Sequence, residues 1–476
     1  MGVFRKTKFL GTIIVAVTAC LPIPKYDLPH QDDSAHLETS VAEALEGGSF
    51  QFGQWPGRGW WKGFGDPVLN YLEESALELS PTLKRVEERL KASFEVTKEA
   101  RSKLYPEIDF DGNTNWQHFS KYGFFRGLIP GVIPAVLNDI TMNLTFRYEF
   151  DFWGKNRALL HAAIGSSAAL AAERMQSELI LTTSIAYAYA EMQYLLCQRK
   201  IWEQKEENLK AIVMIRAKRE KYALDTIMES LSARSAALDA KAKIVDLDQK
   251  TKQQVHRLKA LSGLGQDIAL TIEYRALDPL QVFIPEKLSL DLISRRPDLI
   301  AQRARVEAAS FQVGAARTLF YPNINLTAFA GLESIHWNKL LKMPTFDGSL
   351  EPAIHLPILT GGRINAQWKE KIADFNEALF GYNEIILQAA QEVADQLTNI
   401  SSLQKEIGVR QETLSIENEW ERVSKRRMEH ALDTQIEWIK SKNRVLDAEL
   451  TIAALEYGKQ LANILLIRGL GGGLYD

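Results

Sequence analysis

The stretch DITMNLTFRYEFDF, residues 139–152, alternates strictly between polar and apolar side chains. A period of two residues predicts a β-strand with one wet face and one apolar face. At ~3.3 Å per residue this strand would be ~40 Å long, well beyond the usual strand of a globular domain. The apolar side chains occupy the even positions and the polar ones the odd positions: Ile140, Met142, Leu144, Phe146, Tyr148, Phe150 and Phe152 against Asp139, Thr141, Asn143, Thr145, Arg147, Glu149 and Asp151.

The sequence around this strand contains an internal duplication. Residues 81–106 can be laid over residues 297–322 at a constant offset of 216 without a gap, and the tetrapeptide ALDT of residues 223–226 recurs at residues 431–434. This period is far too long for a solenoid, so one large unit is repeated. Each copy reads as a helix, two strands and a pair of long helices.

The boundaries follow from breaker residues. Each opening helix ends at a Tyr-Pro pair, because proline stops a helix and biases the residue before it to an extended conformation. Strands are predicted at about residues 106–118, 139–152, 322–333 and 350–359, of which the last has the weakest pattern, and helical hairpins at about residues 155–262 and 363–467, where Gly and Pro are almost absent.

The long helices carry apolar residues at heptad-like spacing. Leu231, Leu238, Ala242 and Val245 are examples in the first copy, and this spacing indicates coiled-coil packing. On spacing alone, a solvated coiled coil that encloses no tunnel is an equally good interpretation.

The N-terminus predicts export. Three cations at residues 5–8 precede an uncharged, largely apolar run over residues 9–19, which is typical of a secretory signal peptide. The run is shorter than the ~20 residues of a spanning helix, although a membrane anchor is the alternative interpretation. We therefore expect residues 1–19 to be a signal peptide.

The segment Val17-Thr18-Ala19-Cys20 resembles the lipobox of bacterial lipoproteins. The resemblance implies that Cys20 is diacylated and becomes the mature N-terminus. The other cysteine, Cys197, lies in a predicted helix, so we expect a half-buried apolar side chain and no intrachain disulfide.

Charge and composition exclude several classes of function. A net charge of −3 and a pI near 6.3 do not fit a nucleic-acid-binding protein. The eight histidines have no metal-ligand spacing, and no nucleophile motif is present. The glycine-rich residues 469–473 are not followed by the Lys-Ser/Thr or the helix of a phosphate cradle. We predict no enzyme, no cofactor, no metal site and no nucleic-acid partner.

Four long strands per chain predict an oligomer. A sheet that lies in a bilayer cannot leave an edge unpaired, so its strands must close into a barrel, and bacterial barrels begin at about eight strands. Several chains must therefore share one barrel, with the even-numbered side chains of residues 140–152 toward lipid and the odd-numbered ones toward a wet lumen.

From about residue 59 to residue 473 the chain resembles the TolC-type outer-membrane factors, in the lipoprotein branch that serves resistance-nodulation-division pumps. The likeness is carried by short motifs: Trp60-Trp61 with Phe64 and Asp66-Pro67; RRPDL at residues 295–299 through YPNI at residues 321–324; FDFWG at residues 150–154; LPI at residues 356–358 with GGR at residues 361–363; and GLGGG at residues 469–473.

The resemblance implies a mixed, mainly α fold: a TolC-like trimeric channel with a 12-stranded transmembrane β-barrel, four strands per chain, continuous with a 12-helix periplasmic α-barrel. It implies a homotrimer in the outer membrane that conducts drugs, detergents, metal ions or other solutes passively from an inner-membrane pump and a periplasmic adaptor. The expected segments are a signal peptide at 1–19, a lipid-anchored segment at 20–58, repeats at 59–278 and 279–473, and a tail at 474–476.

The family also implies a gate at the turns of the two long hairpins. Family turns use glycine, whereas this chain has Ala223 and Ala431, which reach left-handed backbone less easily. Either Asp225 and Asp433 reshape the turns, or the alignment is displaced by a residue or two. The charged residues expected to form the periplasmic gate are Asp225, Glu229, Asp433, Glu437 and Lys440. Lys440 stands where the family often has an acidic residue, and ordinary solvated charges are the alternative interpretation.

Two other functions remain open at this point. An outer-membrane duct of a type I protein secretion system has the same fold, although the lipobox favours the pump branch. A periplasmic coiled-coil adaptor or structural lipoprotein is a different class, and the strand at residues 139–152 argues against it because such a protein has no use for lipid-facing strands.

Overall fold

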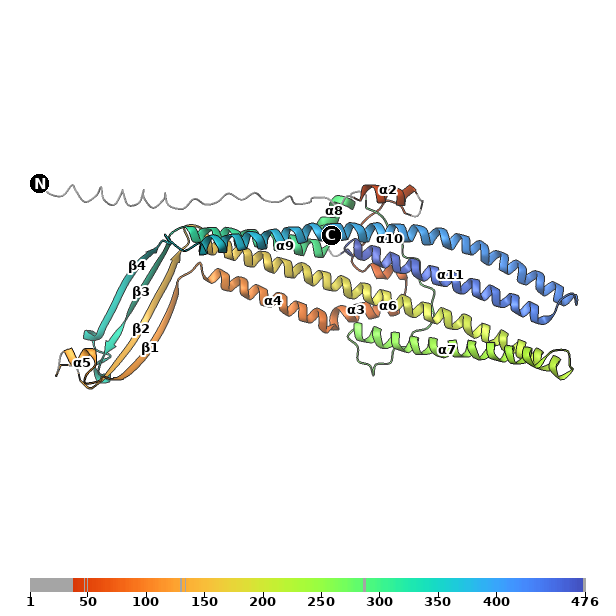
Figure 1. Cartoon of the computed structure of the whole chain (residues 1–476), viewed down its shortest axis with the longest axis horizontal. Helices are drawn as coiled ribbons and strands as arrows, with labels where there is room; N and C mark the ends of the chain where they lie inside the picture. The colour runs from red at the N-terminus through yellow and green to blue at the C-terminus, as the bar shows by residue number, and fades with distance from the viewer. Residues whose placement is uncertain are drawn as a thin grey trace. The chain divides into compact units, whose positions relative to one another are not determined.

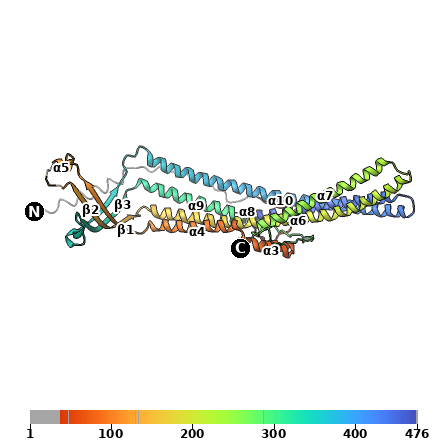
Figure 2. The same ribbon diagram turned by 90° about the horizontal axis from the view of Figure 1, so that it is seen from below.

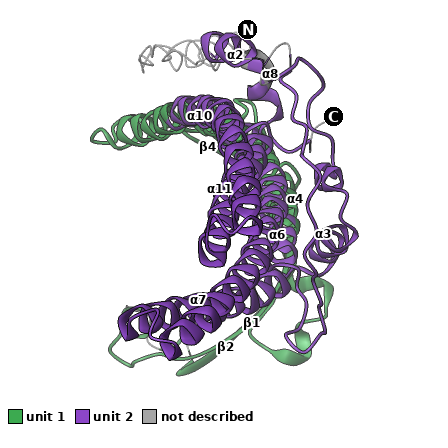
Figure 3. Ribbon diagram, turned by 90° about the vertical axis from the view of Figure 1, so that its right-hand side faces the viewer, with its two compact units in different colours: residues 1–30, 91–169, 303–380 green, residues 31–90, 170–302, 381–476 purple. Residues whose placement is uncertain are grey.

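The computed structural model describes residues 37–46, 48, 50–128, 131–132, 134–285 and 288–473. The predicted signal peptide, Cys20 and the tail at residues 474–476 lie outside these residues. The described chain divides into two compact units, coloured separately in Figure 3. We call residues 91–169 and 303–380 the sheet unit, and the remainder, including residues 170–285 and 381–473, the hairpin unit.

The sheet unit contains one antiparallel sheet with the strand order β1-β2-β3-β4 in the described chain, as Figure 1 shows. Its strands are β1 (Glu107–His118), β2 (Val136–Phe150), β3 (Asn323–Ser334) and β4 (Phe346–His355). Because β1 and β2 come from the first sequence copy and β3 and β4 from the second, the β2·β3 pairing joins the two halves of the duplication.

Two strands differ from their predicted bounds by more than one residue. β2 begins at Val136, three residues before its predicted start. It ends at Phe150, because the Asp151 side chain accepts hydrogen bonds from the backbone N–H groups of Asn156 and Arg157 at 3.1 and 3.0 Å. β4 lies four residues earlier than the predicted 350–359, at Phe346–His355. Phe346 and Gly348 belong to the strand because they pair with Leu332 and Ala330 of β3, and the last pair is His355 with Asn323.

The register gives the sheet one apolar face and one polar face. Across all four strands, even-numbered residues pair with even-numbered residues, as in the rows Ile108·Phe146·Ala328·Leu350 and Phe110·Leu144·Ala330·Gly348. The odd-numbered rows are mainly polar, for example Glu107·Arg147·Thr327·Glu351, in which Arg147 forms ion pairs with Glu107 and Asp109 of β1. The alternation of residues 139–152 therefore extends over the whole sheet.

Helices make up most of the described chain, so the predicted mixed, mainly helical fold is confirmed. No helix among the described residues combines the length and apolarity needed to cross a membrane. The helices are α2 (Glu38–Glu46), α3 (Pro67–Leu79), α4 (Pro81–Ser102), α5 (Phe124–Leu128), α6 (Lys155–Lys221), α7 (Ile227–Leu261), α8 (Leu288–Arg295), α9 (Pro297–Arg317), α10 (Arg363–Glu429) and α11 (Gln435–Gly469), with 3-10 turns η1 (Trp60–Phe64), η2 (Thr318–Phe320), η3 (Trp337–Lys339) and η4 (Met343–Thr345).

Four long helices of the hairpin unit lie in a row in the order α7, α6, α11, α10, as the purple parts of Figure 3 show. α6 contacts α7 through the Arg199–Asp248 ion pair at 2.7 Å. α6 contacts α11 through Asn208, whose amide donates to Asn443 at 2.9 Å. α11 contacts α10 through Arg444, which pairs with Glu417 at 2.7 Å. α7 and α10 therefore form the two outer edges of this row. Short turns join α6 to α7 and α10 to α11 (Figure 2).

An apolar core anchors residues 60–64 to this row. Trp60, Trp61 and Phe64 of η1 pack with residues of α3, α6 and α11. Asp66 caps α3 by accepting from Val68 N–H at 2.8 Å, and the Tyr189 hydroxyl of α6 donates to its other oxygen at 2.8 Å. The Trp-Trp and Asp-Pro motifs of the sequence therefore hold a buried contact between α3 and α6.

Glu73 of α3 is fully buried, and neither of its carboxyl oxygens has a hydrogen-bond partner among the described residues. Burial raises the pKa of this carboxyl well above its ordinary value. The folded chain therefore keeps a proton that the unfolded chain has already lost. As a result, the free energy of unfolding should fall as the pH rises from the ordinary carboxyl pKa through the raised one.

We expect Glu73→Gln to be more stable than the parent at neutral pH, because glutamine keeps the shape of the protonated side chain. The difference should grow with pH by up to ~1.4 kcal/mol per pH unit between the two pKa values. Denaturant unfolding in detergent between about pH 4 and about pH 8 measures it. The control is Glu74→Gln, because the Glu74 side chain is 62 % exposed. Equal pH slopes for parent and Glu73→Gln would mean that the carboxyl is ionised in the fold.

Candidate functional site: the turns of the two long hairpins

Both long hairpins of the hairpin unit reverse at an alanine in left-handed backbone. Ala223, between α6 and α7, and Ala431, between α10 and α11, each have φ of 56°. They are the non-glycine residues with positive φ in the described part of the chain. The structure thus places both alanines in the conformation that glycine favours.

The hydrogen bonds at the two turns are the same. Leu224 N–H donates to the Arg219 carbonyl at 2.8 Å and Ala223 N–H to the Glu220 carbonyl at 2.9 Å. The corresponding bonds of the second turn are 2.8 Å from Leu432 to Arg427 and 3.0 Å from Ala431 to Met428. This 6→1 and 5→2 pattern is a Schellman motif, which satisfies the last carbonyls of the incoming helix.

The outgoing helices begin with identical caps. The Thr226 hydroxyl accepts from Glu229 N–H at 3.4 Å, and the Thr434 hydroxyl accepts from Glu437 N–H at 3.3 Å. Threonine followed three residues later by glutamate is the sequence pattern of a capping box. The repeated ALDT segment is therefore a helix-reversal motif: the alanine ends one helix and the threonine begins the next.

Replacing Ala223 and Ala431 by glycine should stabilise the protein, because a left-handed residue with a Cβ costs ~1 kcal/mol or more per position. We expect the double variant to gain roughly 1–2 kcal/mol in the free energy of unfolding. Denaturant unfolding measures the gain. The matched control is Ala217→Gly, an exposed helical position of α6, which should lose ~0.5–1 kcal/mol. A loss at both turns would mean that the alanine Cβ atoms contribute contacts that outweigh the strain.

Two arginines neutralise the acidic residues of the first turn. Asp225 accepts from Arg216 at 2.9 Å and from Arg219 at 3.0 Å, and Arg216 also pairs with Glu229. Burial raises the pKa of Asp225, but the hydrogen bonds and charges of the two arginines outweigh it, so the pKa lies below the ordinary value. The Asp225 side chain is only 4 % exposed. It therefore holds the turn together and is not a free surface charge.

The second turn has fewer and weaker ion pairs. Asp433 lies 3.5 Å from Arg427, and Glu437 pairs with Lys440 at 2.7 Å on an exposed surface. Ser424 stands at the position that corresponds to Arg216. The duplication has therefore kept the backbone of the turn in both copies, whereas only the first copy has the second arginine.

The two hairpins contact each other just above the turns. Ile212 of α6 is buried with Ile436 and Ile439 of α11, and Trp438 packs against the same cluster. The hydrogen bond to Asp225 raises the pKa of Arg216, and the charge of Glu437 on the other hairpin raises it further. Arg216 therefore forms ion pairs with Asp225 and Glu229 of the first turn, and the charge of Glu437 acts on it from the other hairpin.

The sequence identified the acidic residues and Lys440 but missed Arg216, Arg219 and Arg427. All three precede their turn by four to seven residues, on the incoming helix. Comparing the two copies at the offset of 208 residues would have found Arg219 and Arg427, which occupy equivalent positions, but not Arg216.

The charged residues at the two turns can bind opposite charges and hold the helices together. Among the described residues, no group of three His, Cys, Asp or Glu side chains could hold a metal ion.

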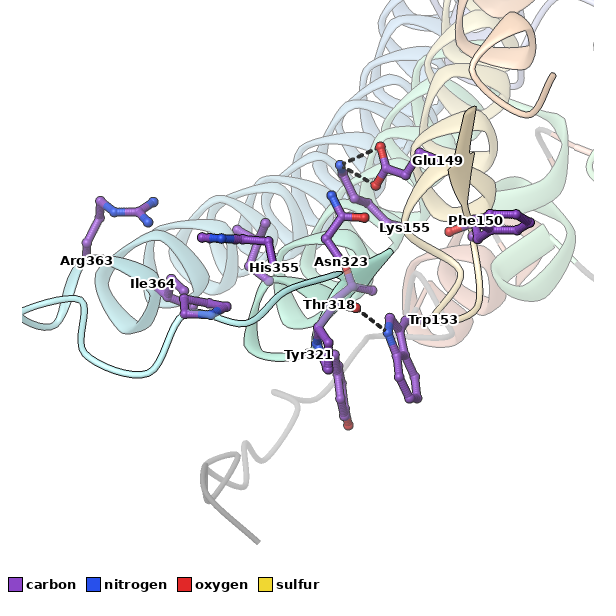
Figure 4. Close-up of a pocket in the computed structure, with 14 residues that line it drawn as sticks. Glu149, Phe150, Trp153, Lys155, Thr318, Tyr321, Asn323, His355, Arg363 and Ile364 are labelled. Carbon is purple, nitrogen blue, oxygen red and sulfur yellow. Dashed lines mark hydrogen bonds and ion pairs between the residues drawn. The ribbon is translucent and has the colours of Figure 1, made fainter. Parts of the chain in front are cut away.

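A second polar cluster lies in the sheet unit, where the strands meet the long helices (Figure 4). It lines a cavity of about 140 Å³. Lys155 pairs with Glu149 at 2.9 Å, and Trp153 donates to the Pro322 carbonyl at 2.7 Å while its ring stacks on Tyr321. In Figure 4 the two rings point away from Glu149 and Lys155. The polar and aromatic sides of this junction are therefore separate, as on the sheet.

Known proteins are similar to this chain in both sequence and fold. A family model described as "Outer membrane efflux protein" matches residues 72–264 and 288–472. The multidrug resistance outer membrane protein MdtP of Escherichia coli (strain K12) is 29 % identical over 96 % of this chain and 94 % of its own length.

Solved structures agree. The outer membrane protein VceC of Vibrio cholerae superposes with a TM-score of 0.79 at 29 % identity, over 88 % of this chain and all of that one. The Campylobacter jejuni CmeC outer membrane channel has a TM-score of 0.83 at 19 % identity, over 95 % of this chain and 94 % of that one, which is a likeness of fold.

Proposed function

Because this chain belongs to the outer membrane efflux protein family, we propose that it is the outer-membrane channel subunit of a tripartite efflux pump. In this proposal it conducts drugs or other solutes passively to the exterior from an inner-membrane transporter and a periplasmic adaptor. The name of MdtP, a multidrug resistance outer membrane protein, supports efflux of drugs.

The observation that carries this proposal is the two-faced sheet. The apolar rows, such as Phe110·Leu144·Ala330·Gly348, suit contact with lipid, and the polar rows suit a wet lumen. The described sheet ends at β1 on one side and β4 on the other, so both strands have an unpaired edge. In a bilayer such edges must be paired, and three copies would supply the twelve strands of a closed barrel.

Passive conduction is the role that this architecture supports. The long helices α6 and α10 each have 67 residues, and at ~1.5 Å per residue each is about 100 Å long. In the proposed trimer, helices of this length form the wall of a periplasmic tunnel. The turns at Ala223 and Ala431 lie at the far ends of these helices and are the proposed gate, with Asp225, Glu229, Asp433, Glu437 and Lys440 as its charged residues.

We also propose that Cys20 is the lipidated mature N-terminus. We expect mass spectrometry of the protein purified from membranes to find residues 1–19 removed and Cys20 carrying acyl chains, because a short apolar run ends there at a lipobox-like sequence. A Cys20→Ala variant is the control and should retain its leader or be cleaved elsewhere. An unmodified Cys20 in the mature protein would refute lipid attachment at this site.

Planar-bilayer recording tests the proposed channel directly. The purified full chain should migrate as a trimer and give stepwise ion currents without any pump. In cells, deleting its gene should raise susceptibility to at least one drug, and a plasmid copy should restore resistance. A monomer without currents would overturn the proposal. A conducting trimer whose loss changes no drug susceptibility, and only blocks secretion of a protein, would replace it by the type I secretion duct.

A further inference from the structure

The two edges of the four-helix row carry matching stripes of exposed apolar side chains. On α7 they are Leu231, Leu238 and Val245, between 51 and 65 % exposed. On α10 they are Val409, Ile416 and Val423, between 45 and 65 % exposed. Each stripe repeats every seven residues, the period at which one face of a helix meets a coiled-coil partner. Among the described residues these six side chains are exposed, and α7 and α10 are the ends of the row in Figure 3.

The stripes match in their distance from the turns. Leu231, Leu238 and Val245 follow Ala223 by 8, 15 and 22 residues, and Val423, Ile416 and Val409 precede Ala431 by 8, 15 and 22 residues. α7 runs away from its turn and α10 runs toward its own. If two copies lie side by side with their turns level, these helices are antiparallel and the stripes coincide at three successive heptads.

Charges beside the stripes are complementary in the same register. On α7, Arg234 and Lys241 follow Ala223 by 11 and 18 residues; on α10, Glu419 and Glu412 precede Ala431 by 12 and 19 residues. All four side chains are exposed. Arg234, Lys241 and Glu412 have no ion-pair partner within the described chain, and Glu419 has only the neighbouring Arg422 at 3.2 Å. Opposite charges that flank an apolar seam select partner and orientation in coiled coils.

We propose that α7 of one copy pairs with α10 of the next copy in an antiparallel seam, in which Leu231 faces Val423, Leu238 faces Ile416 and Val245 faces Val409. The occupant of each stripe is thus a second copy of this chain. Different surfaces meet at such a contact, so it is heterologous, and repetition around an axis closes the row into a ring. This inference rests on the proposed trimer and adds its contact residues and register.

A cysteine pair tests the register in the full chain. In a Cys197→Ala background, the Leu238→Cys/Ile416→Cys variant should form covalent dimers and trimers on mild oxidation, seen on non-reducing gels. Cells that express both single variants, Leu238→Cys and Ile416→Cys, should give dimers, whereas either variant alone should give none. This pattern identifies a contact between copies that joins different surfaces.

Two displaced pairs are the controls. Leu238→Cys/Val409→Cys and Leu238→Cys/Val423→Cys each shift the pair by one heptad, or ~10 Å along the helix. A disulfide needs Cα atoms ~4.4–6.8 Å apart, so both controls should give at least about tenfold less product. A trimer by size-exclusion chromatography that yields no product, or equal product from a displaced pair, overturns the seam and leaves the proposed function standing. A monomer would overturn both.

A charge exchange tests the same register without cysteines. Lys241→Glu and Glu412→Lys should each raise the dissociation constant of the trimer several-fold, because each places like charges beside the seam. The double exchange, Lys241→Glu with Glu412→Lys, should restore it to near the parent value. Additive weakening in the double variant would mean that these two side chains do not face each other, and the proposed register would be wrong.

Discussion

Replacing Asp433 and Glu437 together by alanine is expected to raise the resting conductance of the channel several-fold in planar bilayers without any pump. The second turn is held by two pairs, Arg427–Asp433 at 3.5 Å and Glu437–Lys440 at 2.7 Å. The variant removes both pairs, together with the negative charge of Glu437, which raises the pKa of Arg216 on the other hairpin. If the turns close the tunnel, their contacts bias it toward the closed state.

The size of the effect on conductance follows from the populations of the closed and open states. A closed state favoured by ~2–3 kcal/mol is populated about 99 %, so a loss of ~1 kcal/mol raises the open fraction about fivefold. The control is Asp374→Ala, which removes a 2.8 Å ion pair with Lys371 on the same helix, 57 residues before Ala431. Parent-like conductance and salt dependence in the Asp433→Ala/Glu437→Ala variant would make these residues ordinary surface charges.

The second large effect is expected from a charged substitution on the apolar face of the sheet. Leu144 of β2 is 54 % exposed and lies in a row with Phe110, Ala330 and Gly348. If this face contacts lipid, Leu144→Arg should cost ~2–4 kcal/mol near the bilayer midplane. Unfolding by denaturant in lipid vesicles measures the loss, and folded yield in the outer membrane should fall with it.

The next residue provides the matched control. Thr145 lies on the opposite face, in the row with Asp109 and Ser349, so Thr145→Arg places the same charge toward the proposed lumen. We expect this variant to unfold within about 1 kcal/mol of the parent. Equal losses for Leu144→Arg and Thr145→Arg would contradict the assignment of one face to lipid and the other to water.

The strand at residues 139–152 could be predicted because strict alternation directly reports a two-sided environment. The start of β4 could not. Phe346 and Gly348 belong to the strand through pairing with Leu332 and Ala330 of β3, and a partner strand is not visible in local spacing. The end of β2 depended on Asp151, whose side chain caps α6 instead of continuing the alternation.

The repeated ALDT segment identified where the two hairpins turn, but not which charged residues pair there. The spacing identified Asp225 as a charged residue of the turn, but not that its side chain is buried and paired with Arg216 and Arg219. Those arginines lie on the incoming helix, six and nine residues earlier in the chain. A contact across a helix reversal depends on where the turn is, so residue spacing alone did not reveal it.

Corresponding helices of the two copies have equal lengths, which restricts how this chain can change in evolution. α6 and α10 have 67 residues each, and α7 and α11 have 35 each. One residue inserted between Ala223 and Leu231 would rotate the α7 stripe by about 100° and move it ~1.5 Å from its partner. Insertions near the turns should therefore be tolerated in multiples of seven and in both copies of the duplication together. The two halves can diverge freely in side chains, as Arg216 and Ser424 have done, but their lengths must change together.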